Sequence, residues 1–309
     1  MTHDLPAGSD RRALPRPFGR LLTAMVTPFT TDGSVDFDGV ARLANYLVDE
    51  QANDALVING TTGESPTTTD AEKEQLIRAV VEAVGGRAKV VAGVGTNDTR
   101  HTIELAAAAE KAGADGLLVV TPYYNKPPQT GLLAHFTAVA DATGLPVMLY
   151  DIPHRAGVPI ATETMLRLAE HERIVAVKDA KGDLAATSLV TSQTDLAYYS
   201  GEDSLTLPAL AIGAVGLVGT STHLTGALTK QMIEAYDAGD ITTALVLHRR
   251  LLPLFTGIFR TQGTILVKAA MAAHGLPAGP VRPPLVPATE AEIVQLRADC
   301  AEAGLELPV

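Results

Sequence analysis

The stretch Arg173-Ile-Val-Ala-Val-Lys-Asp-Ala180 decides the fold of this chain. Its four apolar residues, mostly β-branched, run without a polar break and stop at Lys178. Such a run is typical of a strand that is buried on both faces, as in parallel sheets flanked by helices. A lysine in mid-strand would be costly, because a buried ammonium must be paired or lose its proton. We therefore expect Lys178 to lie where the strand ends.

The same strand-then-helix pattern occurs eight times between residues 20 and 239, with short connections. The lysine strand is the sixth of the eight. The other predicted strands cover residues 21–27, 55–58, 89–94, 116–120, 145–150, 197–199 and 215–218. Eight βα units with near-continuous apolar strands fit a (β/α)8 TIM barrel, an α/β fold, better than a doubly wound open sheet.

The two ends of the chain differ from this repeat. Residues 1–19 carry Asp, Arg and Pro but no apolar h-region, which predicts a disordered lead-in and excludes a secretory signal. Beyond Gly239 the strand pattern stops, and helical patterns follow at 241–254, 264–274 and 289–303. The sequence therefore predicts a catalytic barrel over residues 20–239 and a C-terminal helical domain over residues 240–309.

Composition limits the possible partners. The net charge of −11 argues against nucleic acid and against an anionic membrane surface, because either would require a basic face. No apolar run reaches the length of a membrane span. The single cysteine, Cys300, cannot form an intrachain disulfide, which fits a reducing compartment. We expect a cytoplasmic protein that binds neither nucleic acid nor membrane.

The position of Lys178 points to chemistry. In a βα barrel the carboxyl ends of the strands open into the active site. A lysine that is desolvated there has its pKa lowered and becomes an amine nucleophile towards a carbonyl. The alternative is that Lys178 only ends the strand and pairs with Asp179 or Glu202.

Other polar residues also follow the predicted strands. The segment Asn59-Gly-Thr-Thr-Gly-Glu-Ser65 suits a turn that binds a small anion, or an ordinary βα turn. Tyr150 ends the fifth strand, where a phenol can relay protons. Arg155 follows it and offers a fork for a carboxylate. Each of these residues alone is more typical of packing or solvation, but together on one rim they predict an active site.

Several other barrel chemistries lack their motifs. The eight histidines show no HxH or HxxxH spacing, so the sequence predicts no metal site. There is no GxSxG elbow for serine hydrolysis. Gly93-Val-Gly95 lacks the third glycine of a dinucleotide fingerprint.

Five motifs carry a family resemblance that covers nearly the whole chain after residue 20. They are Gly60-Thr-Thr-Gly-Glu-Ser65, Thr121-Pro-Tyr-Tyr-Asn125, Tyr150-Asp-Ile-Pro-His-Arg-Ala-Gly157, Val177-Lys-Asp179 and Ser200-Gly-Glu-Asp203. With them the chain resembles the N-acetylneuraminate lyase and dihydrodipicolinate synthase family of pyruvate-dependent class I aldolases. The resemblance implies a lyase that condenses pyruvate with L-aspartate 4-semialdehyde to 4-hydroxy-tetrahydrodipicolinate, in diaminopimelate and lysine biosynthesis. It implies no metal and no organic cofactor.

The resemblance also assigns catalytic roles. Lys178 would form the imine with pyruvate, and Tyr150 would be the general acid and base. Tyr150 would be linked through the Thr61 hydroxyl to Tyr124, which in this family reaches in from a neighbouring subunit. A homo-oligomer is therefore implied, commonly a tetramer built as a dimer of dimers.

Substrate-binding roles follow in the same way. Thr62, Gly201 and the backbone around Val218 would bind pyruvate, and Arg155 would hold the carboxylate of the semialdehyde. Arg155 separates the synthases from their sugar-acid relatives, which do not typically carry an arginine there. Two alternatives stay open: a pyruvate-dependent sugar-acid lyase, and a non-catalytic keto-acid sensor on the same fold.

Some members of the family are inhibited by lysine at a subunit interface. Ser65, Asn97 and Tyr123 match positions that line that pocket. Asp70, Lys73 and His101 depart from the His, His and Glu of inhibited members. A cation at Lys73 would repel a lysine ligand, so the sequence predicts weak or absent lysine feedback.

Overall fold

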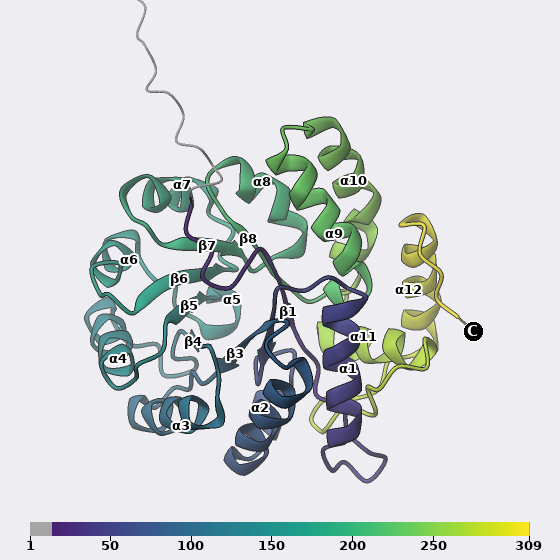
Figure 1. Cartoon of the computed structure of the whole chain (residues 1–309), viewed down its shortest axis with the longest axis horizontal. Coiled ribbons are helices and arrows are strands. Elements are labelled where there is room, and N and C mark those ends of the chain that lie inside the picture. Colours follow the sequence, from purple (N-terminus) through teal and green to yellow (C-terminus); the bar gives the residue numbers. More distant parts are fainter. Residues whose placement is uncertain (1–13, 309) are drawn as a thin grey trace, which may run out of the picture.

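The computed structural model describes residues 14–308, and in this range eight parallel strands close into a barrel in sequence order (Figure 1). The strands are β1 (Leu21–Ala24), β2 (Ala55–Ile58), β3 (Lys89–Gly93), β4 (Gly116–Val120), β5 (Val147–Asp151), β6 (Ile174–Asp179), β7 (Ala197–Ser200) and β8 (Gly216–Gly219). β8 pairs with β1 and completes the closure. The predicted TIM barrel is confirmed.

Helices surround the barrel and cover the outer faces of its strands (Figure 1). They are α1 (Phe37–Asp49), α2 (Asp70–Val84), α3 (Thr99–Ala112), α4 (Gln129–Asp141), α6 (Thr162–Leu168), α7 (Leu184–Gln193), α8 (Thr206–Ala211) and α9 (Thr222–Asp237). Local sequence fixes several of their starts. Thr69 and Glu72 form a reciprocal capping box at α2, and Asp98 and Asp183 accept backbone hydrogen bonds at the first turns of α3 and α7.

The segment before β1 reaches into the barrel. Of the predicted lead-in over residues 1–19, residues 1–13 lie outside the described residues. In the described part of that segment, Phe18 is buried inside the barrel cluster. A Cβ on Gly116, the first residue of β4, would lie 2.4 Å from the Phe18 ring. The Tyr199 hydroxyl donates to the Gly19 carbonyl at 2.9 Å and holds this segment across the amino ends of the strands.

Three further helices follow the barrel. α10 (Ile241–Gly257) packs on α9 and on α12 (Glu290–Glu302), and α11 (Gly263–Ala273) contacts α12 and α9 and lies between α12 and the barrel (Figure 1). Leu254, Phe255 and Leu266 belong to the same hydrophobic cluster as the barrel helices. Because this core is shared, the domain boundary at residue 239 stays a prediction. No helix within residues 14–308 is both long enough and apolar enough to cross a membrane.

Candidate active site

Lys178 lies near the carboxyl end of β6, between Tyr150 of β5 and Tyr199 of β7 in the barrel register. Its side chain is buried, and the Nζ atom lies 4.3 Å from the centre of the Tyr150 ring. Burial lowers the pKa of Lys178 to about 8, and the positive charge of Arg155 adds to the effect while Asp203 opposes it. A much larger fraction of the amine is therefore neutral near physiological pH than for an exposed lysine.

The structural alternative for Lys178 was an ion pair with a neighbouring carboxylate. In the described part of the chain no carboxylate lies within ion-pair distance of its Nζ atom. Asp179 instead accepts hydrogen bonds from the Lys181 backbone and from the Thr187 hydroxyl. Lys178 is therefore buried without the partner that a structural lysine would have.

Tyr150 connects Lys178 to a cavity. Its side chain is buried, and burial raises the pKa of its phenol well above the ordinary value, while Arg155 and a side-chain hydrogen bond with Thr61 lower it. Tyr150 therefore keeps its proton at neutral pH and can donate it or pass it on to a hydrogen-bonded partner.

The cavity has a volume of about 420 Å³ and lies at the carboxyl ends of β2 to β5. Thr61, Tyr150 and Arg155 all line it. Arg155 belongs to the short helix α5 (Pro153–Ala156), which the sequence analysis did not anticipate. The predicted relay hydroxyl, the acid-base phenol and the carboxylate-binding guanidinium thus share one space beside Lys178.

The turn after β2 is held by backbone hydrogen bonds. Gly63 N–H donates to the Gly60 carbonyl at 3.0 Å, and Glu64 N–H donates to the Thr61 carbonyl at 3.2 Å. Thr62 is buried, and its hydroxyl lies 3.4 Å from that of Thr220, which follows β8. The turn is thus fixed against the β8 side of the barrel mouth.

Gly201 and Val218 lie on the other side of Lys178. A Cβ on Gly201 would lie 3.0 Å from Lys178 Cγ, so glycine leaves room for the lysine stem. Val218 is buried in the same barrel-interior cluster as Tyr150. Gly201 is therefore next to Lys178, while Val218 lies in the barrel interior together with Tyr150.

Among the predicted catalytic residues, Tyr124 is exposed and does not line the cavity. Its side chain is 89% exposed, and its backbone φ of 73° is left-handed, which is uncommon for a non-glycine residue. Its neighbour Tyr123 lines the cavity instead. The side chain of Asn125 ties the same loop to the Asn97 carbonyl at 2.8 Å.

Sequence reasoning missed Asp203 as a residue that organises the site. It is fully buried and accepts hydrogen bonds from the backbone of Thr220 and from the backbone and hydroxyl of Ser221. Burial raises the pKa of Asp203, and its charge raises that of Lys178. Asp203 closes the motif Ser200-Gly-Glu-Asp203 shortly after the seventh strand, but the sequence assigned it no role.

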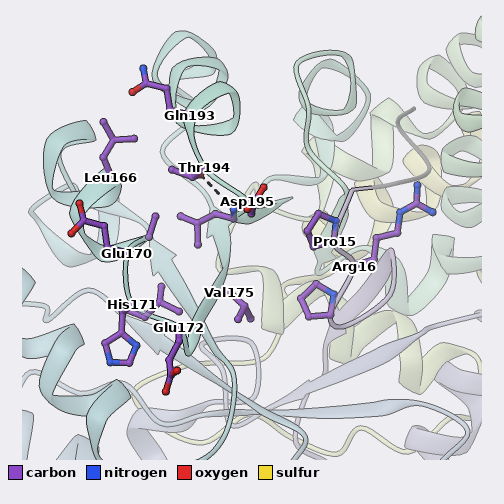
Figure 2. A pocket seen from close by; sticks show the side chains of 14 residues that line it. Pro15, Arg16, Leu166, Glu170, His171, Glu172, Val175, Gln193, Thr194 and Asp195 are labelled. Carbon is purple, nitrogen blue, oxygen red and sulfur yellow. Dashed lines mark hydrogen bonds between the residues drawn. The ribbon is translucent and has the colours of Figure 1, made fainter. Parts of the chain in front are cut away.

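A second, larger cavity of about 870 Å³ opens at the other end of the barrel, where β6 begins (Figure 2). Figure 2 shows Pro15 and Arg16 on one side of it and Glu170 and His171 on the other. It has no lining residue in common with the cavity beside Tyr150. Across residues 14–308, no three His, Cys, Asp or Glu side chains are grouped so that they could hold a metal ion.

Known proteins are similar to this chain in sequence and in fold. The 4-hydroxy-tetrahydrodipicolinate synthase of Acidothermus cellulolyticus is 72% identical over 94% of this chain and 94% of its own. The crystal structure of a dihydrodipicolinate synthase from Bacillus anthracis is 45% identical, with a TM-score of 0.90 over 92% of this chain and 98% of its own. The structure of the Cyanidioschyzon merolae synthase with lysine bound is 43% identical, with a TM-score of 0.92 over 94% of this chain and 100% of its own.

The model of the dihydrodipicolinate synthetase family matches residues 17–303, which include every predicted site residue. With a match over nearly the whole chain, and with relatives of such high identity, the conclusion is direct. This chain belongs to the dihydrodipicolinate synthetase family of enzymes.

Proposed function

We propose that this chain condenses pyruvate with L-aspartate 4-semialdehyde to 4-hydroxy-tetrahydrodipicolinate, in diaminopimelate and lysine biosynthesis. The observation that carries the proposal is Lys178, which is buried and forms no ion pair with a carboxylate in the described residues. Its pKa is lowered to about 8, and it contacts Tyr150, which lines the cavity. The activity in the name of the 72% identical relative supports it.

Lys178 is the nucleophile of the proposed reaction. Its neutral amine attacks the carbonyl carbon of pyruvate, and loss of water from the carbinolamine leaves an imine. Loss of a proton from the pyruvate methyl group gives an enamine, which attacks the aldehyde carbon of the second substrate. The amine of that substrate then displaces Lys178 from the imine and closes the ring. The cycle uses no metal and no organic cofactor.

Tyr150 is the proposed general acid and base, and Thr61 is its relay partner. Both side chains line the same cavity, and the interaction with Thr61 lowers the pKa of the Tyr150 phenol, which supports this pairing. The third member, Tyr124, is exposed, and its left-handed backbone conformation is strained. Strained residues persist where other contacts hold them, and a contact with another subunit would do so. We propose that Tyr124 enters the site of a neighbouring subunit in a homotetramer built as a dimer of dimers.

The two substrates have separate binding groups in the proposal. Thr62, Gly201 and the backbone at Val218 bind pyruvate, with the carboxylate at the Thr61–Thr62 turn. Arg155 binds the carboxylate of the semialdehyde from the wall of the cavity. A cytoplasmic location remains the prediction from the sequence.

The first test follows pyruvate consumption by NMR with two acceptors in parallel, L-aspartate 4-semialdehyde and N-acetylmannosamine. We expect loss of pyruvate only with the semialdehyde. Turnover only with the sugar would move the protein to the sugar-acid lyases. Absence of a borohydride-trapped pyruvate adduct on Lys178 would favour a keto-acid sensor.

Arg155→Met tests how the acceptor is chosen. Loss of a charged hydrogen bond to a carboxylate costs about 1.5–3 kcal/mol, so the KM for the semialdehyde should rise roughly 10- to 100-fold. The half-saturating pyruvate concentration for adduct formation should change little. An unchanged semialdehyde KM would remove Arg155 from the proposal.

A further inference from the structure

The turn that carries Thr61 and Thr62 begins and ends with a left-handed residue that is not glycine. Asn59 has a φ of 62° and Glu64 a φ of 56°. Such residues persist only where surrounding contacts hold them. The Asn59 side chain donates to the Lys73 carbonyl at 3.1 Å, and the Glu64 side chain is held from the C-terminal segment.

Glu64 is held by two groups that lie far away in the sequence. Its carboxylate forms an ion pair with Lys268 of α11 at 2.6 Å and accepts a hydrogen bond from the backbone N–H of Arg282 at 2.8 Å. The Glu64 and Lys268 side chains are only 1% and 3% exposed. A carboxylate buried so fully is tolerated only because these partners compensate its charge.

Lys268 is itself fixed by its surroundings. Its Nζ atom donates to the Pro280 carbonyl at 2.8 Å and lies 4.2 Å from the centre of the Phe29 ring. The guanidinium of Arg282 lies at the same distance from that ring and donates to the Thr67 carbonyl at 2.7 Å. The ion pair therefore sits in a rigid setting that can define where Glu64 lies.

A second contact reaches the turn from the same helix face. Thr264 precedes Lys268 by one helical turn of α11, and its hydroxyl donates to the Thr62 carbonyl at 3.0 Å. Thr264 is 1% exposed. α11 thus holds the turn both at Thr62 and at Glu64.

We infer that Lys268 and Thr264 are positioning residues, through which the C-terminal helices set the place of Thr61 and Thr62 in the active site. The inference rests on the proposed function, since the roles of the two threonines are themselves proposed. Neither residue lines the cavity, so both act through the turn. The C-terminal helices then serve the chemistry as well as the packing of the barrel.

The expected consequence of losing Lys268 follows from its partner. In Lys268→Met the Glu64 carboxylate stays buried with its main countercharge gone, so the turn has to rearrange. A displacement of about 1 Å in a substrate-binding group can cost on the order of 100-fold in efficiency. We expect the half-saturating pyruvate concentration for adduct formation to rise roughly 10-fold or more.

The experiment measures borohydride-trapped adduct on Lys178 against pyruvate concentration, together with kcat and KM, in the full-length protein. Arg260→Met is the matched control, because Arg260 pairs with the buried Asp299 in the same C-terminal segment and, within residues 14–308, has no hydrogen bond or ion pair with the turn. Both variants should lose thermal stability. Only Lys268→Met should shift the pyruvate dependence.

Two further variants guard against simple misfolding. Thr264→Val keeps the shape of the side chain and removes only its hydrogen bond to Thr62, and should raise the half-saturating pyruvate concentration a few-fold. The double variant Glu64→Gln with Lys268→Met removes both charges and should recover most of the affinity lost in Lys268→Met.

The outcomes separate the inference from the proposed function. If native protein traps no pyruvate on Lys178, the proposed function fails. If native protein does trap it, and Lys268→Met and Thr264→Val have the pyruvate dependence of Arg260→Met, the inference is overturned and α11 only packs against the barrel.

Discussion

Lys178 and Lys268 are two buried lysines whose side-chain nitrogens have different neighbours. Lys178 and Lys268 are both almost fully buried, and burial lowers the pKa of each to about 8. Lys268 lies between the carboxylate of Glu64 and the carbonyl of Pro280. Lys178 has the face of Tyr150 beside it and a cavity next to that ring.

The difference shows that a lowered pKa reports desolvation and not reactivity. An amine becomes a nucleophile when its lone pair is free and a substrate has room to reach it. The nitrogen of Lys268 is engaged by fixed acceptors, while that of Lys178 lies against the ring of Tyr150, which lines the cavity. Geometry therefore selects Lys178 where the pKa values alone would not.

The largest expected effect would separate the two lysines directly. Lys178→Met should lower turnover by several orders of magnitude, because the imine cannot form without the amine. Lys268→Met should keep measurable turnover and still trap pyruvate. Steady-state rates and mass spectrometry of trapped adducts on both variants check this. Equal losses in the two variants would break the comparison.

Tyr150→Phe should have the next largest effect. It retains the ring beside Lys178 and removes the hydroxyl that hydrogen-bonds with Thr61. Loss of general acid-base catalysis typically costs about 10²- to 10⁴-fold in rate. Trapping should still detect the pyruvate adduct at long incubation, which distinguishes a lost proton relay from a lost nucleophile. A nearly normal kcat would contradict the assigned role.

The pH dependence of adduct formation should report Lys178 alone. Its lowered pKa of about 8 means that the neutral amine increases as pH rises through that value. Below it, the initial rate should fall about tenfold for each pH unit. Stopped-flow or quenched trapping from pH 6 to 10 measures the midpoint. Lys268→Met should leave the midpoint in place, and a large shift would show that the two lysines are coupled.

A third buried lysine gives the smallest expected effect. Lys73 of α2 is buried and donates its Nζ hydrogen to the Thr68 carbonyl, while His101 pairs with Asp70 at 2.9 Å nearby. A fixed cation there disfavours a second ammonium. We expect L-lysine to change the rate by less than about twofold at millimolar concentration. Steady-state titration measures this, and strong inhibition would refute it.

Much of this architecture could be predicted because its signals are local. The apolar run that ends at Lys178 and the alternation of strands and helices need only neighbouring residues to be recognised. The position of Tyr150, Thr61 and Arg155 at one rim then follows from parallel strands that share a direction. Their shared cavity is thus a consequence of topology.

The parts that could not be predicted depend on contacts between distant segments. In the sequence Glu64 looks like any acidic turn residue, because its partners Lys268 and Arg282 lie more than 200 positions further along the chain. Phe18 lay in a proline- and arginine-containing segment whose composition suggested disorder, and its burial depends on the missing side chain of Gly116. Tyr124 is exposed within this chain, so its proposed role depends on a second chain and not on a local pattern.

Phe18 has a consequence for the traffic of reactants. With its ring filling the barrel interior at the strand starts, molecules exchange with the site through the opposite mouth. The water released by imine formation then leaves through the same mouth of the barrel through which the semialdehyde enters. Pyruvate has to reach Lys178 first, because the aldehyde is attacked by the enamine that pyruvate forms there. We therefore expect the substrates to bind in a fixed order, and an excess of the semialdehyde in the shared mouth should slow the entry of pyruvate.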